Sequence, residues 1–182
     1  MNSETYSLID TTIKIGLGAI IASLSSYLLT RLNHKSDARK EFYKRYFDTI
    51  EKISDSAEDY FQKWSRCISA ISGVSKGQIE KGIPVSDEGW KKIRERDGLL
   101  IQARDNKMTA ISRLKLLGIN DAAVILDETA NVENELREVV IFECKIPNLK
   151  EIHSIQDKMK KKRNLFYIES NKHYNEKKIT SS

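Results

Sequence analysis

Residues 11–30, TTIKIGLGAIIASLSSYLLT, form an apolar stretch with a single charged residue, Lys14. A helix rises about 1.5 Å per residue, so a segment of this length covers about 30 Å, the hydrocarbon thickness of a bilayer. The uncharged run, 15–30, is shorter, but the long stem of Lys14 can follow the apolar surface while its ammonium group reaches the headgroups. The sequence therefore predicts a transmembrane helix over 11–30, after a short extracytoplasmic N-terminus over 1–10.

The charges on either side of this stretch predict its orientation. Basic residues dominate the segment after it, whereas Glu4 and Asp10 precede it. The positive-inside rule therefore places the C-terminal part in the cytoplasm and makes the chain a single-pass protein of the cytoplasmic (inner) membrane. Anionic lipids attract such basic flanks. We expect membrane lipids to be partners, with headgroup contacts at Lys14, Arg31, Lys35, Arg39 and Lys40.

One face of the predicted span carries small residues. Gly18, Ala22 and Ser26 are spaced four apart, and such spacing lets two helix backbones approach closely. Small residues are also common in membrane helices that do not associate. Helix association through this face is one interpretation of the pattern, with a second copy of the chain or another membrane protein as the partner.

Two alternatives to a span remain open. A cleaved signal peptide needs a basic leader and small residues at its cleavage site, whereas this leader is acidic and the apolar run ends in Leu28, Leu29, Thr30 and Arg31. A helix buried in a soluble core is the second alternative, because short apolar runs often pack in that way.

The remainder of the chain predicts an all-α fold. Charged residues make up 31% of the whole chain, which has only two prolines and eight glycines, a composition that suits long helices. Apolar residues recur every three or four positions from Phe42 to Ile71, and this wide stripe indicates burial in a helical bundle. Similar patterns predict further helices over 87–117, 121–146 and 148–175. We expect a cytoplasmic bundle of about four helices over 31–176 and a frayed tail over 177–182.

The long loop of the bundle is predicted at 73–86. It holds three glycines and Pro84, and Gly73 is expected to end the preceding helix. Loops of this length are often functional, but the glycines near Lys76 do not match the spacing of a phosphate-binding loop. Ser86 or Asp87 is expected to cap the helix that follows.

A polar pair is predicted across the next helix hairpin. Arg104 lies on the apolar side of its helix, seven residues after Asp97. Gly118 is expected to end this helix in the left-handed conformation. If the chain folds back there, Arg104 comes opposite the stretch from Glu133 to Glu135. We expect a structural ion pair between Arg104 and Glu135 that helps to set register. The alternative is an arginine whose head extends to solvent.

The last helix carries the sharpest cluster of basic residues in the chain. A contact with phosphate groups of lipid or nucleic acid is one interpretation, and a solvated helix face is the favoured alternative, because charge runs alone are weak signals. Too few aromatic residues lie nearby for a base-stacking platform, so nucleic acid is not the expected partner. The cluster consists of Lys158, Lys160, Lys161, Lys162 and Arg163.

No catalytic or metal-binding pattern emerges from the sequence. Cys67 and Cys144 are far apart and fit no metal-ligand spacing, and the three histidines share no helical face. We therefore expect no enzyme activity, no metal and no cofactor. The predicted function is a membrane-anchored interaction or regulatory module that self-associates. The alternative is a membrane effector, whose oligomerised transmembrane helices perturb the bilayer when the cytoplasmic domain is triggered.

Overall fold

The computed structural model describes the secondary structure of residues 3–181, and the side chains of these residues except 3–22, 32–36, 80 and 177–181. All regular secondary structure within these limits is helical. The chain divides into two units, Met1–Arg45 and Tyr46–Ser182. The second unit, called the body below, contains the helical bundle.

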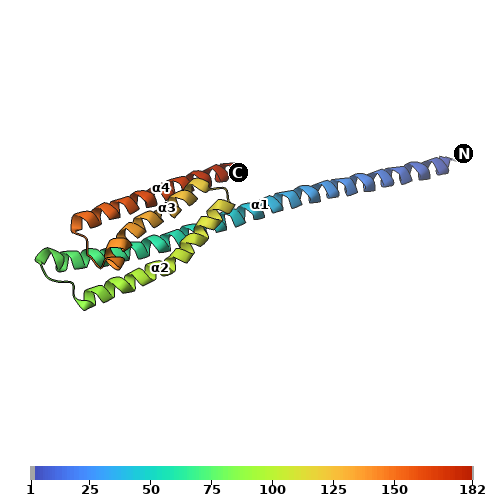
Figure 1. Ribbon diagram of the computed structural model, residues 1–182. Helices are drawn as coiled ribbons and strands as arrows, with labels where there is room; N and C mark the ends of the chain where they lie inside the picture. The colour runs from blue at the N-terminus through green and yellow to red at the C-terminus, as the bar shows by residue number, and fades with distance from the viewer. Residues whose placement is uncertain (1–2, 182) are drawn as a thin grey trace. The chain divides into compact units, whose positions relative to one another are not determined.

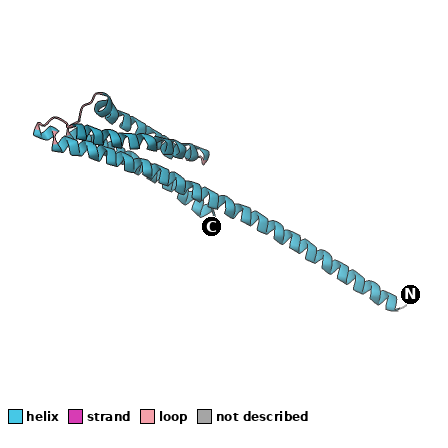
Figure 2. Ribbon diagram, turned by 90° about the horizontal axis from the view of Figure 1, so that it is seen from below, coloured by secondary structure: helices cyan, strands magenta, loops and turns pink. Residues whose placement is uncertain are grey.

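Four α-helices, a short 3₁₀ turn and a π-helical turn follow one another along the described chain. Successive helices of the body run in opposite directions (Figure 1), and short loops join them (Figure 2). Helix α3 lies against both α2 and α4. The all-α bundle of about four helices is therefore confirmed. Its elements are α1 (Ser3–Gly77), η1 (Ile79–Lys81), α2 (Asp87–Leu116), α3 (Asn120–Arg137), η2 (Glu138–Phe142) and α4 (Leu149–Ser181).

The predicted span falls largely on residues whose side chains are outside the described set. Residues 11–22, with Lys14, Gly18 and Ala22, belong to this part, while 23–30 are helical and exposed. Among the residues for which side chains are described, no helix combines the length and the apolar character needed to cross a bilayer. The span and its small-residue face thus stay predictions.

The basic flank of the predicted span is partly described. Arg31, Arg39 and Lys40 are exposed on α1, whereas Lys35 lies outside the described side chains. The Arg39 guanidinium lies 5.7 Å from the ring centre of Tyr43. These three side chains are therefore accessible, and their contacts with lipid headgroups remain predicted.

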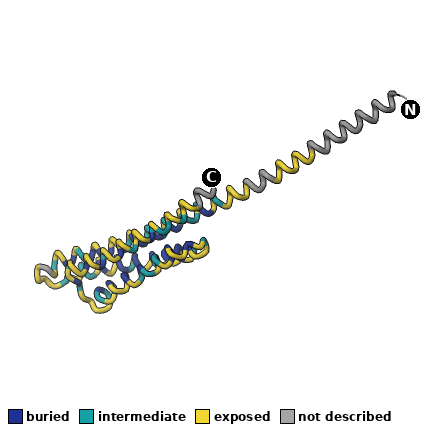
Figure 3. Tube along the Cα trace, turned by 90° about the horizontal axis from the view of Figure 1, so that it is seen from above, coloured by how far each residue is buried: buried dark blue, intermediate teal, exposed yellow. Residues whose placement is uncertain are grey.

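The core of the body follows the apolar stripe of α1. Ile53, Ala57, Tyr60 and Trp64 are buried at helical spacing and meet apolar residues of the other three helices in one cluster. The buried positions line the inner faces of the helices (Figure 3). The stripe was expected to begin at Phe42, but that side chain is 60% exposed and lies before the body.

The first helix does not end at Gly73 as predicted. It continues to Gly77, because the residues after Gly73 make tertiary contacts. Val74 and Ser75 are buried, and the Ser75 hydroxyl donates a hydrogen bond to the carbonyl oxygen of Pro147 at 2.9 Å. This contact joins the end of α1 to the segment before α4.

The loop between α1 and α2 is consequently shorter than predicted, and the side chain of Gln78 bonds across it to Ser86. The side-chain amide nitrogen of Gln78 donates to the Ser86 hydroxyl at 3.0 Å, and the side-chain oxygen of Gln78 accepts from the Ser86 backbone N–H at 3.1 Å. The Ser86 hydroxyl also accepts from the N–H of Gly89. Ser86 is therefore confirmed as the N-cap of α2.

The two ends of α3 differ. Before it, Gly118 adopts a φ of 77°, the left-handed conformation predicted for the turn after α2. After it, the helix was expected to reach residue 146, but it widens into the π-helical turn η2 and ends at Phe142. Cys144 then takes a φ of 52°, and the chain passes through Pro147 into α4.

Candidate functional site

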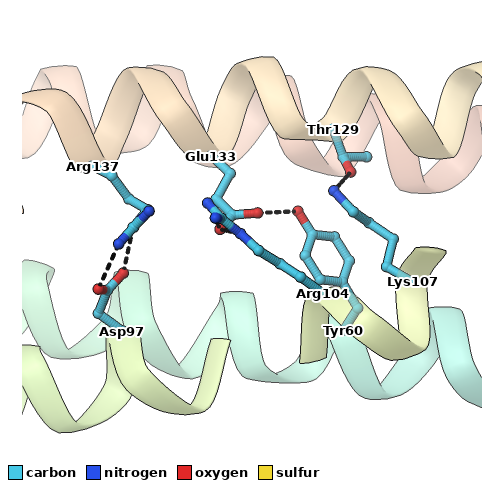
Figure 4. A network of polar contacts seen from close by, with 7 residues as sticks. All are labelled: Tyr60, Asp97, Arg104, Lys107, Thr129, Glu133 and Arg137. Atoms are coloured by element: carbon cyan, nitrogen blue, oxygen red, sulfur yellow. Dashed lines mark hydrogen bonds and ion pairs between the residues drawn. The ribbon is translucent and has the colours of Figure 1, made fainter. Parts of the chain in front are cut away.

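A layer of polar side chains lies inside the bundle, between α2 and α3 and over α1. Its members form hydrogen bonds and ion pairs with one another (Figure 4). Buried polar groups are costly unless they are paired, so each contact bears on what the layer can do. The layer consists of Tyr60, Asp97, Arg104, Lys107, Thr129, Glu133 and Arg137.

Glu133 is the centre of the layer and is fully buried. Its Oε1 accepts a hydrogen bond from Arg104 Nε at 2.7 Å, and its Oε2 accepts from the Tyr60 hydroxyl at 3.0 Å. Burial, with the negative charge of Glu133, raises the pKa of Tyr60 far above its usual value. Tyr60 therefore remains a hydrogen-bond donor at physiological pH.

The predicted partner of Arg104 was wrong by two residues. Arg104 pairs with Glu133, whereas Glu135 is about half exposed and pairs with Lys158 of α4 at 2.6 Å. Two residues correspond to about 200° of rotation around a helix, so the two glutamates point to different neighbours. Pairing across the hairpin was foreseen, but the register of α3 against α2 decides which glutamate takes part.

A second ion pair joins the same two helices. Arg137 donates to both carboxylate oxygens of Asp97, from Nε at 2.8 Å and from the terminal nitrogen at 3.1 Å. These hydrogen bonds raise the pKa of Arg137. The sequence placed Asp97 on the apolar side of α2 but did not identify Arg137. Arg137 lies four residues after Glu133, so both share one helix face, and this spacing is the signal that could have identified Arg137 as a member of the layer.

The order of charges along each helix explains why both pairs form. On α2 the acid Asp97 comes before the base Arg104, and on α3 the acid Glu133 comes before the base Arg137. Because the helices are antiparallel, each acid meets a base. A shift that brought Arg104 opposite Arg137 would place like charges together. The layer therefore disfavours a shifted register, a well-attested use of buried polar groups.

Lys107 is the least satisfied member of the layer. Only 3% exposed, it donates a long hydrogen bond of 3.4 Å to the Thr129 hydroxyl, and its ammonium lies 4.6 Å from the centre of the Tyr60 ring. Burial lowers its pKa.

Cys67 of α1 lies in the same core. Burial raises the pKa of Cys67 to about 12, so this thiol stays protonated and packs as an apolar group.

An open groove lies on the outside of the body between α1 and α4. Its volume is about 360 Å³. Phe61, Trp64 and Met159 form its floor, each only 3% exposed. Lys160 and Arg163 line it with positive charge and Asp157 with negative charge. This groove combines the aromatic helix and the basic cluster, two features that the sequence presented separately.

Acidic residues of other helices neutralise much of the predicted basic cluster. Lys158 pairs with Glu135, Lys162 with Glu128, and Arg163 with Glu58 at 2.8 Å. Among the described residues, no acidic side chain pairs with Lys160 or Lys161, which are exposed. Phosphate or lipid contact by the cluster stays a prediction, and the structure leaves Lys160 and Lys161 as its unpaired members within the described part.

Glu58 connects α1 to α4 at one end of this groove. It accepts hydrogen bonds from Arg163 and, at 2.8 Å, from the hydroxyl of Tyr167. Burial opposes ionisation of Glu58, but these hydrogen bonds outweigh it and lower the pKa. Burial and the carboxylate together raise the pKa of Tyr167 to about 12.

No family model matches the chain, and neither the curated proteins nor the solved structures gave a match. Among the described residues, no group of three or more His, Cys, Asp or Glu side chains is arranged to hold a metal ion. The function is therefore inferred from the geometry. The buried layer pairs charged groups of α2 and α3, and the outer groove between α1 and α4 is lined by both apolar and charged residues.

Proposed function

We propose that the protein is a membrane-anchored helical interaction module without catalytic activity, held by residues 11–30 in the cytoplasmic membrane with its body in the cytoplasm. The apolar stretch and the basic flank after it support the anchor and its orientation. Self-association through Gly18, Ala22 and Ser26, or association with another membrane protein, is part of this proposal.

The observation that carries the proposal is the extent of α1. This single helix, Ser3–Gly77, includes both the predicted anchor and the segment that supplies Tyr60 and Trp64 to the core. No proline or glycine occurs between residues 19 and 72, and helix kinks arise mostly at such residues. The predicted anchor and the core segment of α1 thus belong to one element of secondary structure.

The groove between α1 and α4 is the binding surface in this proposal. Phe61 and Trp64 form its floor and are almost completely buried, at 3% exposure each. Lys160 of α4 lines it as an exposed positive charge with no acidic partner among the described residues, so contact with a partner would rest on the shape of the groove and on Lys160. The buried acids of the core, in contrast, are paired inside the bundle, Asp97 with Arg137 and Glu133 with Arg104.

Membrane fractionation of the full-length protein tests the anchor. We expect it to stay in the membrane fraction in high salt and to be released by detergent, because an apolar span is not held by electrostatics. Release by high salt alone would contradict the span.

Crosslinking of the full-length protein in membranes tests self-association. Replacing Gly18 and Ala22 by leucine is expected to reduce crosslinked dimers, because bulky side chains hold the backbones apart. A matched control, Leu17→Ile with Leu24→Ile, changes the aliphatic face and should leave dimers unchanged. If the wild type makes lipid vesicles leak and the leucine variant does not, the membrane-effector alternative replaces the proposal.

A further inference from the structure

A second groove, of about 260 Å³, lies on the body between α1 and α2. We propose that this groove binds the phosphate groups of a small soluble anion with at least two negative charges, of the diphosphate class. The site does not depend on the predicted anchor, and Ser65 is the one lining residue that it shares with the groove between α1 and α4. Its lining residues are Ser65, Arg66, Ser69, Ala70, Lys92 and Arg96.

Helix geometry explains why these side chains meet. Ser65 and Ser69 are four residues apart on α1, and Lys92 and Arg96 are four apart on α2. Residues at this spacing lie on the same helix face. Each helix therefore presents two polar side chains to the groove, and Arg66 adds a third positive charge beside the serines. Arg96 is half-buried, so its stem forms part of the groove wall.

The groove has no internal counter-charge. Its lining contains three cations and no acid. Among the described residues, none forms a hydrogen bond or ion pair with Arg66, Lys92 or Arg96. Arg66 does lower the pKa of Asp59 from a distance, but that carboxylate already binds Lys63 and Asn106. These three positive charges thus have no acidic partner among the described residues, and an anion in the groove would supply one.

The size and donors of the groove favour phosphate over an acidic helix. A volume of about 260 Å³ equals a cube about 6 Å on a side, whereas a helix with its side chains is about 10 Å across. The arginine guanidinium matches two phosphate oxygens at once, lysine binds phosphate as a point charge, and serine hydroxyls donate to the remaining oxygens. A carboxylate side chain brings one charge only, too few for three cations.

Calorimetric titration of the full-length protein in detergent with inorganic pyrophosphate, at low salt, tests the site. We expect binding that weakens at least about tenfold in Lys92→Ala with Arg96→Ala, because charge-assisted contacts are lost. The matched control is Lys91→Ala with Arg94→Ala. It removes two charges from the same stretch of α2, outside the groove lining, and should bind within about twofold of wild type.

Several outcomes would overturn the proposal. The proposal is wrong if the wild type does not bind pyrophosphate, or if it binds only an acidic peptide. It is also wrong if Lys91→Ala with Arg94→Ala loses as much pyrophosphate affinity as Lys92→Ala with Arg96→Ala. If phosphatidylserine vesicles bind the wild type more strongly than Lys92→Ala with Arg96→Ala, and pyrophosphate does not bind, the phosphate chemistry belongs to lipid headgroups and a soluble ligand is contradicted. Circular dichroism confirms that each variant is folded. If the α2 variant does not fold, Arg66→Ser makes the same test from α1.

Discussion

Glu133 and Arg104 form a charge pair at 2.7 Å across the α2–α3 hairpin, with the carboxylate fully buried and the arginine side chain one-third exposed. Replacing Glu133 by alanine leaves both Arg104 and Tyr60 without their acceptor. We expect the free energy of unfolding to fall by about 2–3 kcal/mol, with the loss limited because water reaches the arginine. Urea denaturation followed by circular dichroism measures this loss.

The double variant Arg104→Met with Glu133→Leu provides the control for this pair. Removing both charged partners abolishes the buried charge, so we expect it to be more stable than Glu133→Ala alone. If the double variant loses the sum of what Arg104→Met and Glu133→Leu each lose alone, the two residues are not coupled.

Replacement of Glu135, two residues further along α3, should cost less stability than replacement of Glu133. Its pair with Lys158 is about half exposed on both sides, so solvent screens the attraction. Glu135→Ala should lower the free energy of unfolding by less than about 1 kcal/mol. The same urea experiment measures it, and a loss as large as that of Glu133→Ala would show that exposure is not what separates the two glutamates.

Two glycines predict opposite effects on replacement by alanine. A Cβ at Gly73 would meet no atom within 4 Å, and the position lies inside α1, so Gly73→Ala should stabilise the protein by up to about 1 kcal/mol. Gly118 has a φ of 77°, so Gly118→Ala should destabilise it by about 1 kcal/mol. Thermal unfolding of both variants measures the difference, and destabilisation by Gly73→Ala would contradict an uninterrupted helix at residue 73.

Acid should weaken the contact between α1 and α4 at Glu58. Its pKa in the folded state is below the ordinary value of 4.5, so the unfolded chain takes up the proton first and stability falls as pH falls. The contribution is complete above about pH 4.5 and is lost as pH drops through the folded-state pKa. Denaturation midpoints between pH 6 and about 3 should therefore decline less in Glu58→Gln than in the wild type. Glu95→Gln changes an exposed residue of α2, and its denaturation midpoints should fall with pH as much as those of the wild type.

Lys107 predicts a gain in stability at alkaline pH. Its folded-state pKa is below the ordinary 10.5, so between these two values the unfolded chain binds more protons and stability rises with pH. We expect Lys107→Met to lack this contribution and to be no less stable than the wild type at neutral pH, because a buried charge with a poor partner is removed. Urea denaturation at about pH 7 and about pH 10 gives both values. A large loss at neutral pH would show that the Thr129 contact matters more than desolvation.

The sequence was sufficient for features that depend on neighbouring residues. The apolar period of α1 identified Ile53, Tyr60 and Trp64 as core positions, and they are buried. Likewise Ser86 and Gly118 marked a helix start and a helix end, because capping and left-handed backbone conformations are local properties of the residue. The predicted span over 11–30 rests on the same kind of local signal.

The tertiary structure decided which distant residues meet. Gly73 stays helical because Ser75 bonds to Pro147, 72 residues away. The basic run of α4 is largely neutralised because Lys158 meets Glu135 and Arg163 meets Glu58, pairs separated by 23 and 105 residues. Arg104 takes Glu133 because helix register selects one side of α3. The sequence by itself determined the helices and their buried faces, since periodicity is local. Only packing determined the charge pairing and the grooves, since both depend on register between helices.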